Sequence, residues 1–234
     1  MKKILLLMAV ALPFAFISCG DDKDEPIVPD NHEYVDLGLS SGTLWATCNV
    51  GAKSPEEYGD YFAWGETSPK SEYTVQNYKW CNGNIYTTLT KYNVRFEYGT
   101  VDNKGELDSE DDAAYVNWGP SWRMPSIAQQ RELLVECSWE WTTRNGVNGR
   151  LGTGPNGNTI FLPAAGFCNG NMNESSGRLG VYWSCSPDFI MPYSANVLHF
   201  DSGSFNSGDK IDIWWGSYPR EGGGSVRAVL VTQN

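Results

Sequence analysis

The alternation of apolar and polar residues predicts that the domain begins with two paired strands. Residues 34–39 alternate along Tyr-Val-Asp-Leu-Gly-Leu, and residues 43–50 are rich in β-formers. Ser41-Gly42 between them is typical of a turn, so the two runs predict a β-hairpin. Ser54 followed by Pro55 predicts a single helical turn over 54–58.

The next segment is less regular. Residues 61–64 form a short apolar run that predicts a strand ending at Gly65. Residues 66–108 are polar, weakly periodic and dotted with aromatic side chains. We therefore predict a long insertion with little regular structure over this range.

Two helices are predicted after the insertion. Residues 107–114 begin acidic and end in alanine, as in a helix whose carboxylates meet the positive end of its dipole. A second helix follows Pro125, with Ser126 as its cap. Its apolar positions fall on one helical stripe, with Gln130 among the polar positions elsewhere. The stripe consists of Ile127, Leu133, Leu134 and Cys137.

The remainder of the chain indicates strands and turns. Trp139 and Trp141 alternate with polar residues at the start of this region, and four later β-rich runs follow. The runs are residues 159–163, 180–184, 195–200 and 225–230. Two helices followed by a series of strands predict an α+β fold, and the length of 34–234 suits a single domain.

The N-terminus has the pattern of an export signal. Lys2 and Lys3 precede an apolar run from Ile4 to Ile17, which is too short for a stable membrane span. We interpret residues 1–18 as a signal peptide. Phe16-Ile17-Ser18-Cys19 resembles the lipobox of bacterial lipoproteins, which implies lipidation of Cys19. An ordinary secreted protein with a chance cysteine is the alternative.

Residues 19–33 are acidic and proline-containing, and they bury too little apolar surface to offset the entropy of ordering. We expect a flexible tether here. It resembles the acidic signal of Bacteroidetes lipoproteins that are sent to the cell surface, whereas a plain solvated spacer is the alternative. The expected location is the outer membrane, with the domain exposed at the cell surface and the lipid as the only attachment.

Charge and cysteine content limit the classes of ligand, disulfide and metal site that the chain is expected to have. The net charge is −11, which disfavours binding to nucleic acid or to anionic lipid. Beyond Cys19 there are five cysteines, Cys48, Cys81, Cys137, Cys168 and Cys185, so at least one has no internal partner. Cys168 and Cys185 are the best candidates for a disulfide between neighbouring strands. The cysteine spacings do not suggest zinc.

Several motifs recur in an order that resembles one known family. Gly119 to Ser126, Gly-Pro-Ser-Trp-Arg-Met-Pro-Ser, is similar to the G-x-x-W-R-[ML]-P-[ST] signature of the Fibrobacter succinogenes major paralogous domain. The other matching segments are residues 35–46, 161–166, 182–186, 195–200 and 225–229. The resemblance implies a C-type-lectin-like fold, in which two helices pack on small antiparallel sheets with long irregular loops. It also implies a secreted or cell-surface protein.

The same resemblance implies that Trp122, Arg123 and Pro125 belong to the frame of the domain. A guanidinium stacks on an aromatic ring and donates to backbone carbonyls in a planar fork, which lysine does not reproduce. Binding of a ligand carboxylate by Arg123 is the alternative.

Evidence for catalysis is weak. His32 lies in the tether, and His199 should point to solvent, opposite Leu198 and Phe200. No reactive cysteine pair of the formylglycine-generating type follows Cys185. A cluster of carboxylates could serve a glycosidase or hold calcium, but a solvated helix start is the simpler interpretation. The cluster comprises Glu106, Asp108, Glu110, Asp111 and Asp112. We expect no cofactor and no metal.

Aromatic and short polar residues between residues 187 and 218 have the composition of a binding surface. Trp214 and Trp215 are adjacent, so only one can point inward from a strand. We predict a module that binds a glycan, peptide or protein; a carbohydrate-active hydrolase and a structural subunit of a surface assembly are the alternatives. The candidate ligand-binding residues are Asp188, Phe189, Tyr193, Asn196, His199, Asp212, Trp214, Trp215 and Tyr218.

Overall fold

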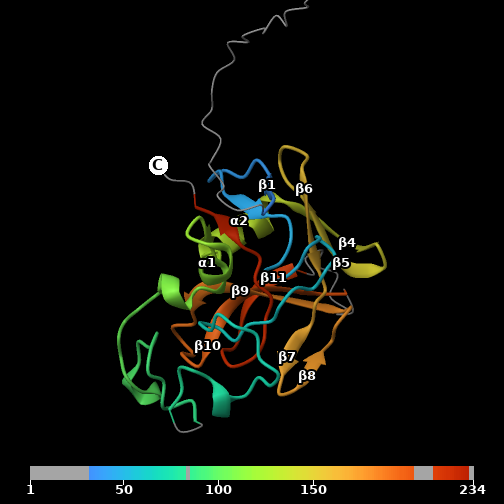
Figure 1. Ribbon diagram of the computed structural model, residues 1–234. Helices are drawn as coiled ribbons and strands as arrows, with labels where there is room; N and C mark the ends of the chain where they lie inside the picture. Colours follow the sequence, from blue (N-terminus) through green and yellow to red (C-terminus); the bar gives the residue numbers. More distant parts are fainter. Residues whose placement is uncertain (1–31, 83–84, 203–212, 232–234) are drawn as a thin grey trace, which may run out of the picture.

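The computed structural model describes residues 32–82, 85–202 and 213–231. Within these ranges two α-helices pack against three small antiparallel sheets and a two-stranded hairpin (Figure 1). The α+β class predicted from the sequence is therefore confirmed. None of the helices in the described ranges is long and apolar enough to cross a membrane.

The first sheet joins distant parts of the chain. Its strand order is β1 (Tyr34–Asp36), β2 (Leu44–Ala46), β12 (Val229–Leu230) and β3 (Trp122–Arg123). The predicted hairpin is present, with Val35 opposite Trp45. The strand expected over residues 225–230 is reduced to its last part, which lies between β2 and β3 and pairs with both.

The other strands follow one another along the chain. The second sheet has the order β11 (Ile213–Pro219), β10 (Ser194–Asp201) and β9 (Leu179–Pro187). The third contains β4 (Ser138–Arg144), β5 (Val147–Thr153) and β6 (Thr159–Pro163). The hairpin is formed by β7 (Phe167–Asn169) and β8 (Met172–Glu174). Predicted strands at 139–141, 159–163, 180–184 and 195–200 are confirmed, whereas β5 was not predicted.

Both predicted helices are present, and each begins at a capping side chain. Asp112 caps α1 (Ala113–Trp118), and Ser126 caps α2 (Ile127–Glu136) in a capping box with Gln129. Leu133 and Cys137 are buried, as the apolar stripe predicts. Gln130 is buried as well, contrary to its predicted polar face, and its Nε2 donates to the carbonyl of Tyr182 at 3.0 Å.

The long insertion has little regular structure, as predicted. Within 66–108 the described residues contain only the short 3-10 turns η1 (Val75–Asn77) and η2 (Phe96–Tyr98), and η3 (Ser109–Asp111) precedes α1. Before the insertion, the helical turn at 54–58 is a turn closed by Glu57 N–H and Ser54 O at 3.2 Å. The strand expected at 61–64 contributes one bridge, between Phe62 and Gly224.

The core is built from aromatic side chains and two fully buried arginines, Arg220 and Arg227. Trp45, Trp64, Trp122 and Trp183 are among the largest side chains that are fully buried. Arg227 is buried too, and its four hydrogen bonds link segments that are far apart in the sequence. Its Nε donates to Asn49 Oδ1 at 2.9 Å, its Nη1 to the Thr47 carbonyl at 2.9 Å and its Nη2 to the Phe161 carbonyl at 3.0 Å.

The predicted Cys168–Cys185 disulfide is wrong. All five described cysteines are free thiols. Cys185 belongs to the main core, whereas Cys168 belongs to a separate core cluster with Tyr73 and Leu89. Proximity in sequence was a poor guide because the two residues belong to different strands, β7 and β9, and pack into different clusters.

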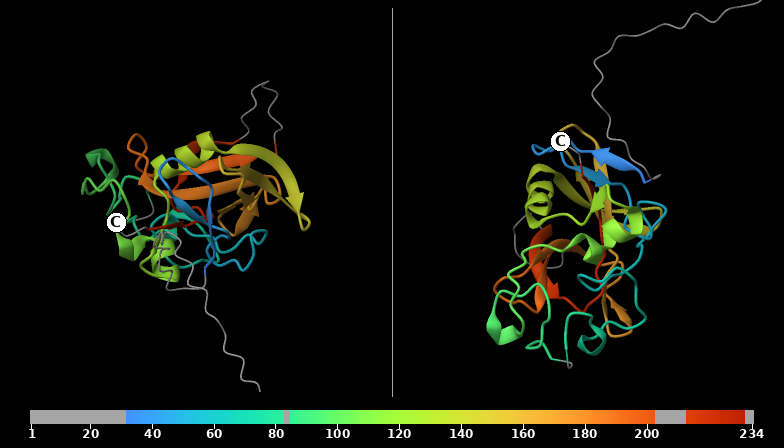
Figure 2. Two further views of the ribbon diagram at one scale, coloured as in Figure 1. Left: turned by 90° about the horizontal axis from the view of Figure 1, so that it is seen from above. Right: turned by 60° about the vertical axis from the view of Figure 1, so that its left-hand side comes forward.

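The described chain begins at one end of the domain, and the insertion lies at the other. Figures 1 and 2 show β1 near the point where the described chain starts, with residues 75–105 at the opposite end. His32 and Glu33, predicted to belong to the flexible tether, contact the domain. The His32 ring stacks on Trp118 with 4.0 Å between centroids, and Glu33 O accepts from Thr47 N–H at 3.0 Å.

Candidate functional site

The candidate ligand-binding residues do not form a single surface. Asp212 lies outside the described residues, and the others divide between the β9–β10 turn and the β10–β11 pair. In that pair His199 lies opposite Trp214, and Leu198 lies opposite Trp215. Adjacent residues of β11 therefore point to opposite sides of the sheet.

His199, Trp214 and Tyr218 pack against one another. The His199 ring lies 4.4 Å from the Trp214 ring and 5.5 Å from the Tyr218 ring, centroid to centroid. Tyr218 also packs on Phe167, with 4.8 Å between centroids. These side chains are half-buried, so the prediction that His199 points freely to solvent is wrong. Burial lowers the pKa of His199 to about 4, because the imidazolium form loses its hydration.

Trp215 is the exposed member of the tryptophan pair. Its side chain is 48% exposed, whereas Trp214 is partly covered, which confirms that only one of the two points outward. The guanidinium of Arg131 on α2 lies 5.0 Å from the Trp215 ring. Trp215 is thus an isolated exposed ring beside α2.

The turn between β9 and β10 presents a group of apolar side chains. Phe189, Ile190 and Met191 are all exposed, and Ile190 reaches 77%. Asp188 shapes this turn, because its Oδ1 accepts from the backbone N–H of Ile190 at 2.8 Å and of Met191 at 3.1 Å. Its carboxylate is therefore already engaged by the chain that carries it.

Asn196 has a similar structural role at the base of the turn. Its Nδ2 donates to the carbonyl of Pro187 at 2.7 Å and to that of Ser186 at 3.3 Å. The pairing of β9 and β10 shifts register between Ala195 and Val197, and these bonds span the irregularity. Asp188 and Asn196 hold the turn in place and leave its apolar side chains outside.

The insertion lies directly against this turn. Arg95 Nη1 donates to the Ile190 carbonyl at 3.1 Å. The Tyr193 ring lies 5.1 Å from Tyr86 and 5.8 Å from Tyr98, centroid to centroid. A Cβ placed on Gly105 would come within 3.3 Å of the Phe189 ring, so this ring rests on the insertion backbone.

The insertion and the turn lie at the end of the domain opposite the start of the described chain (Figure 2), and we call their exposed apolar side chains the distal patch. It contains seven of the twelve large exposed hydrophobic side chains of the described residues. Its members are Ile85, Tyr86, Phe96, Val101, Phe189, Ile190 and Met191. Sequence reasoning singled out the turn but missed the four insertion residues. The sequence does show apolar side chains within this weakly periodic polar segment, and this pattern could have identified the four residues.

Arg220 fixes the insertion to the sheet beneath the patch. It is fully buried, its Nε donates to the Ser194 carbonyl at 3.1 Å, and its Nη2 donates to the Tyr92 carbonyl at 2.8 Å. Its guanidinium also lies 4.6 Å from the Trp64 ring. A planar fork that bonds two segments at once makes the base of the patch rigid.

The acidic cluster is neutralised by lysines. Asp111 is 1% exposed and accepts from Lys79 Nζ at 2.9 Å, Lys91 Nζ at 2.6 Å and the Tyr92 hydroxyl at 2.7 Å. Burial acts to raise the pKa of Asp111, but these three hydrogen bonds outweigh it and lower the pKa. The carboxylate therefore stays ionised as a structural counter-ion.

Other members of the cluster are committed as well. Asp108 accepts from Lys91 Nζ at 2.6 Å and from Lys104. Asp112 Oδ1 accepts from the backbone N–H of Ala114 and Tyr115 at the start of α1. Asp108, Glu110 and Asp111 lie close enough to share a cation, yet the Lys91 ammonium already lies within 4.0 Å of all three. The arrangement fits an ion-pair cluster better than a calcium site or a pair of catalytic acids.

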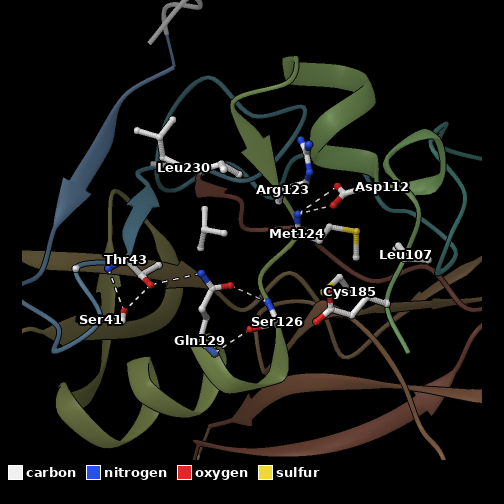
Figure 3. Close-up of a pocket in the computed structure, with 14 residues that line it drawn as sticks. Ser41, Thr43, Leu107, Asp112, Arg123, Met124, Ser126, Gln129, Cys185 and Leu230 are labelled. Atoms are coloured by element: carbon white, nitrogen blue, oxygen red, sulfur yellow. Dashed lines mark hydrogen bonds between the residues drawn. The ribbon is translucent and has the colours of Figure 1, made fainter. Parts of the chain in front are cut away.

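Arg123 and Met124 of the Trp-Arg-Met-Pro motif line a cavity of about 490 Å³ between the first sheet and α2 (Figure 3). Its polar walls bond one another. Gln129 Oε1 accepts from Ser126 N–H at 2.9 Å, and Asp112 Oδ2 accepts from Met124 N–H at 2.9 Å. Burial raises the pKa of the Cys185 thiol to about 12, so this lining residue is a poor nucleophile.

Arg123 has the bonding pattern predicted for a frame residue. Its guanidinium lies 4.0 Å from the centroid of the Tyr115 ring, and its Nη1 donates to the carbonyls of Trp122 at 2.7 Å and Pro120 at 3.0 Å. Arg123 thus holds α1 and β3 together, and its Nη1 is turned to neighbouring backbone.

Comparison of the chain with models of protein families, with curated proteins and with solved structures finds no match in any of the three. The functional argument therefore rests on the residues and their geometry.

Proposed function

We propose that this protein is a surface-anchored binding module that recognises its ligand through the distal patch, without catalysis. One observation carries the proposal: seven of the twelve large exposed hydrophobic side chains of the described residues belong to two segments, the insertion and the β9–β10 turn, that contact each other. Contiguous exposed apolar surface on a folded domain is typical of an interaction site. The buried Arg220 fixes both segments beneath it, so the surface is preorganised for binding.

The position of the patch fits an anchored receptor. A signal peptide over residues 1–18, lipidation at Cys19 and a tether from residue 19 would hold the domain by the end at which the described chain begins. The insertion and the β9–β10 turn lie at the opposite end of the domain (Figure 1) and would then face away from the outer membrane. The motif resemblance to the Fibrobacter succinogenes major paralogous domain supports the same assignment. A C-type-lectin-like fold, in which irregular loops carry recognition, accommodates an insertion that forms half of the surface.

Binding is favoured over hydrolysis by the state of the acidic residues. A glycosidase needs two carboxylates that face a substrate across a cleft. Asp111 instead accepts hydrogen bonds from two lysines and a tyrosine, and Asp112 caps α1. The oxygens of both carboxylates already accept hydrogen bonds within the protein, so neither carboxylate is available to protonate or attack a glycosidic bond.

The binding test compares full-length variants on arrays of glycans, peptides and proteins. We expect Phe189→Ser combined with Ile190→Ser to abolish binding that the unmodified chain shows, because it removes the apolar area of the turn. Val135→Ser on α2 is the matched control, since Val135 is 75% exposed and lies on another element. Binding by a folded Phe189→Ser/Ile190→Ser variant at unmodified strength would contradict the proposal.

Trp215 provides a second, separable test. Its ring lies beside α2 and outside the patch, so Trp215→Ala should reduce binding less than changes in the turn. If Trp215→Ala abolishes binding while the turn variants retain it, recognition belongs to the β11 side of the sheet instead.

Anchoring is tested independently of binding. In cells that produce the full chain, Cys19→Ser should shift the protein from the membrane fraction to the soluble fraction. Added protease should cleave the unmodified chain on intact cells. Membrane association that survives Cys19→Ser would exclude the lipid anchor.

A further inference from the structure

A small internal cavity lies where α2, the first sheet and β9 meet. All eight residues that line it are buried, and they include Trp45 of β2, Pro125 of the Trp-Arg-Met-Pro motif, Gln130 of α2 and Tyr182 of β9. The centre of a water-sized sphere can move within about 10 Å³ there. That space admits one water molecule and excludes larger ligands.

Two of the lining side chains carry a buried polar atom that has no hydrogen-bond partner among the described residues. Trp45 Nε1 is a donor, and Gln130 Oε1 is an acceptor. Both residues are 2% exposed, so bulk water does not serve these atoms. A buried polar group without a partner destabilises a fold, and native proteins bond most such groups to the chain or to an ordered water.

The orientation of the Gln130 amide follows from its other contact. Its Nε2 donates to the Tyr182 carbonyl at 3.0 Å, and because a carbonyl oxygen requires a donor, the amide nitrogen must lie on that side. The amide oxygen is therefore the atom that still requires a donor. Arg227 also lines the cavity, but its hydrogen bonds go to Asn49 and to backbone carbonyls.

The chemistry of these two atoms restricts what the cavity can hold. The indole N–H of Trp45 requires an acceptor, whereas the amide oxygen of Gln130 requires a donor. An anion would serve only the indole, and an ammonium-type cation would serve only the amide. Empty cavities in proteins are apolar, and this one has polar walls. A water molecule both accepts and donates, and it matches the available space.

We propose that this cavity is a binding site for one structural water, which accepts a hydrogen bond from Trp45 Nε1 and donates one to Gln130 Oε1. The water joins α2 to β2, while the direct bond from Gln130 Nε2 to the Tyr182 carbonyl joins α2 to β9. A single glutamine thus connects the helix to both the first and the second sheet. The bridge stabilises the fold only while every member is satisfied.

Nuclear magnetic resonance on the isotopically labelled full chain tests the site. Cross-relaxation between each assigned indole N–H proton and the water resonance is measured in the laboratory and rotating frames. We expect the Trp45 indole proton to show a water cross-peak with the sign of a bound water. Trp64 is the internal control, because its buried indole donates to the Ser184 carbonyl at 2.8 Å and should show no such cross-peak. Absence of the Trp45 cross-peak overturns the proposal.

Gln130→Met tests the second partner, because it removes the acceptor at similar side-chain volume. The Trp45 cross-peak should disappear in this variant and keep its full intensity in Val135→Ser, a change at an exposed position of the same helix. A folded Gln130→Met variant that retains the cross-peak overturns the proposed bridge.

A high-resolution crystal structure of the unmodified chain decides the matter if Gln130→Met does not fold. A density peak ~2.7–3.2 Å from both Trp45 Nε1 and Gln130 Oε1 supports the water site. A cavity without density, or a direct hydrogen bond between the two side chains, overturns it.

Discussion

The guanidinium of Arg123 stacks on the ring of Tyr115, 4.0 Å from its centroid, and donates to the carbonyls of Trp122 and Pro120. One planar group thus joins helix α1 to the strand that follows it. We expect Arg123→Lys to lower the free energy of unfolding by about 1–2 kcal/mol. A lysine ammonium has no planar face to stack on the Tyr115 ring, and it does not reproduce the planar arrangement of donors that bonds the two carbonyls. Urea unfolding measures this loss. Arg178→Lys at an exposed position is the control, and an equal effect of both changes would contradict the frame role.

Asp111 should be essential for stability. Replacement by asparagine removes the charge that binds Lys79 and Lys91 and leaves two lysines without a buried counter-ion. We expect Asp111→Asn to destabilise the fold by about 2–4 kcal/mol in thermal or urea unfolding. Glu110→Gln, at an exposed position next to it, should change stability by less than about 0.5 kcal/mol. A catalytic rather than structural Asp111 would instead leave a stable protein that has lost a measurable turnover.

His199 should make stability depend on pH between its unfolded and folded pKa values. The folded pKa is about 4, below the ordinary value of 6.5, because burial disfavours the imidazolium. In this window the unfolded chain binds a proton that the folded chain does not. The free energy of unfolding therefore falls as the pH drops from 6.5 toward 4, by on the order of 2 kcal/mol after allowing for partial solvent access.

The matched variant is His199→Phe, which keeps a ring against Trp214 and Tyr218. Urea unfolding at pH 6.5 and pH 4.5 should show a smaller difference for this variant than for the unmodified chain. Identical pH dependence in the two proteins would show that His199 is solvated in the folded state.

The five described thiols should react slowly in the folded protein. Burial raises the pKa of Cys168 to about 11 and that of Cys185 to about 12, so little thiolate is present at neutral pH. We expect alkylation without prior reduction to be slow in buffer and complete in urea, as followed by mass spectrometry. A reductant should leave the unfolding midpoint unchanged, whereas a lowered midpoint would indicate a disulfide.

Elements with a local signal could be predicted from the sequence. Helix α2 is capped by Ser126, and its capping box with Gln129 involves residues only three positions apart, so the sequence shows it directly. The first hairpin follows from the alternation of apolar and polar residues on both sides of Ser41-Gly42. The resemblance of residues 119–126 to a known motif implied the frame role of Arg123, whose partners lie within a few residues. The burial of Gln130 was missed, because its partner Tyr182 lies on a strand far along the chain.

The candidate site was only partly predictable, for the same reason. The exposed turn at Phe189 could be identified from composition, but its neighbours come from an insertion nearly 100 residues earlier. His199 was expected to face solvent from the alternation of β10, and that alternation was correct. What alternation cannot show is that Trp214 and Tyr218 of the neighbouring strand cover the side on which His199 lies.

The place of β12 has a consequence for how the protein matures. Val229–Leu230 forms the link between β2 and β3, and Arg227 just before it bonds Thr47, Asn49 and Phe161. The first sheet is therefore incomplete on the ribosome until the last described residues have emerged. A chain whose fold is completed only after synthesis can still be threaded through an export channel, as the signal peptide proposed for residues 1–18 would require.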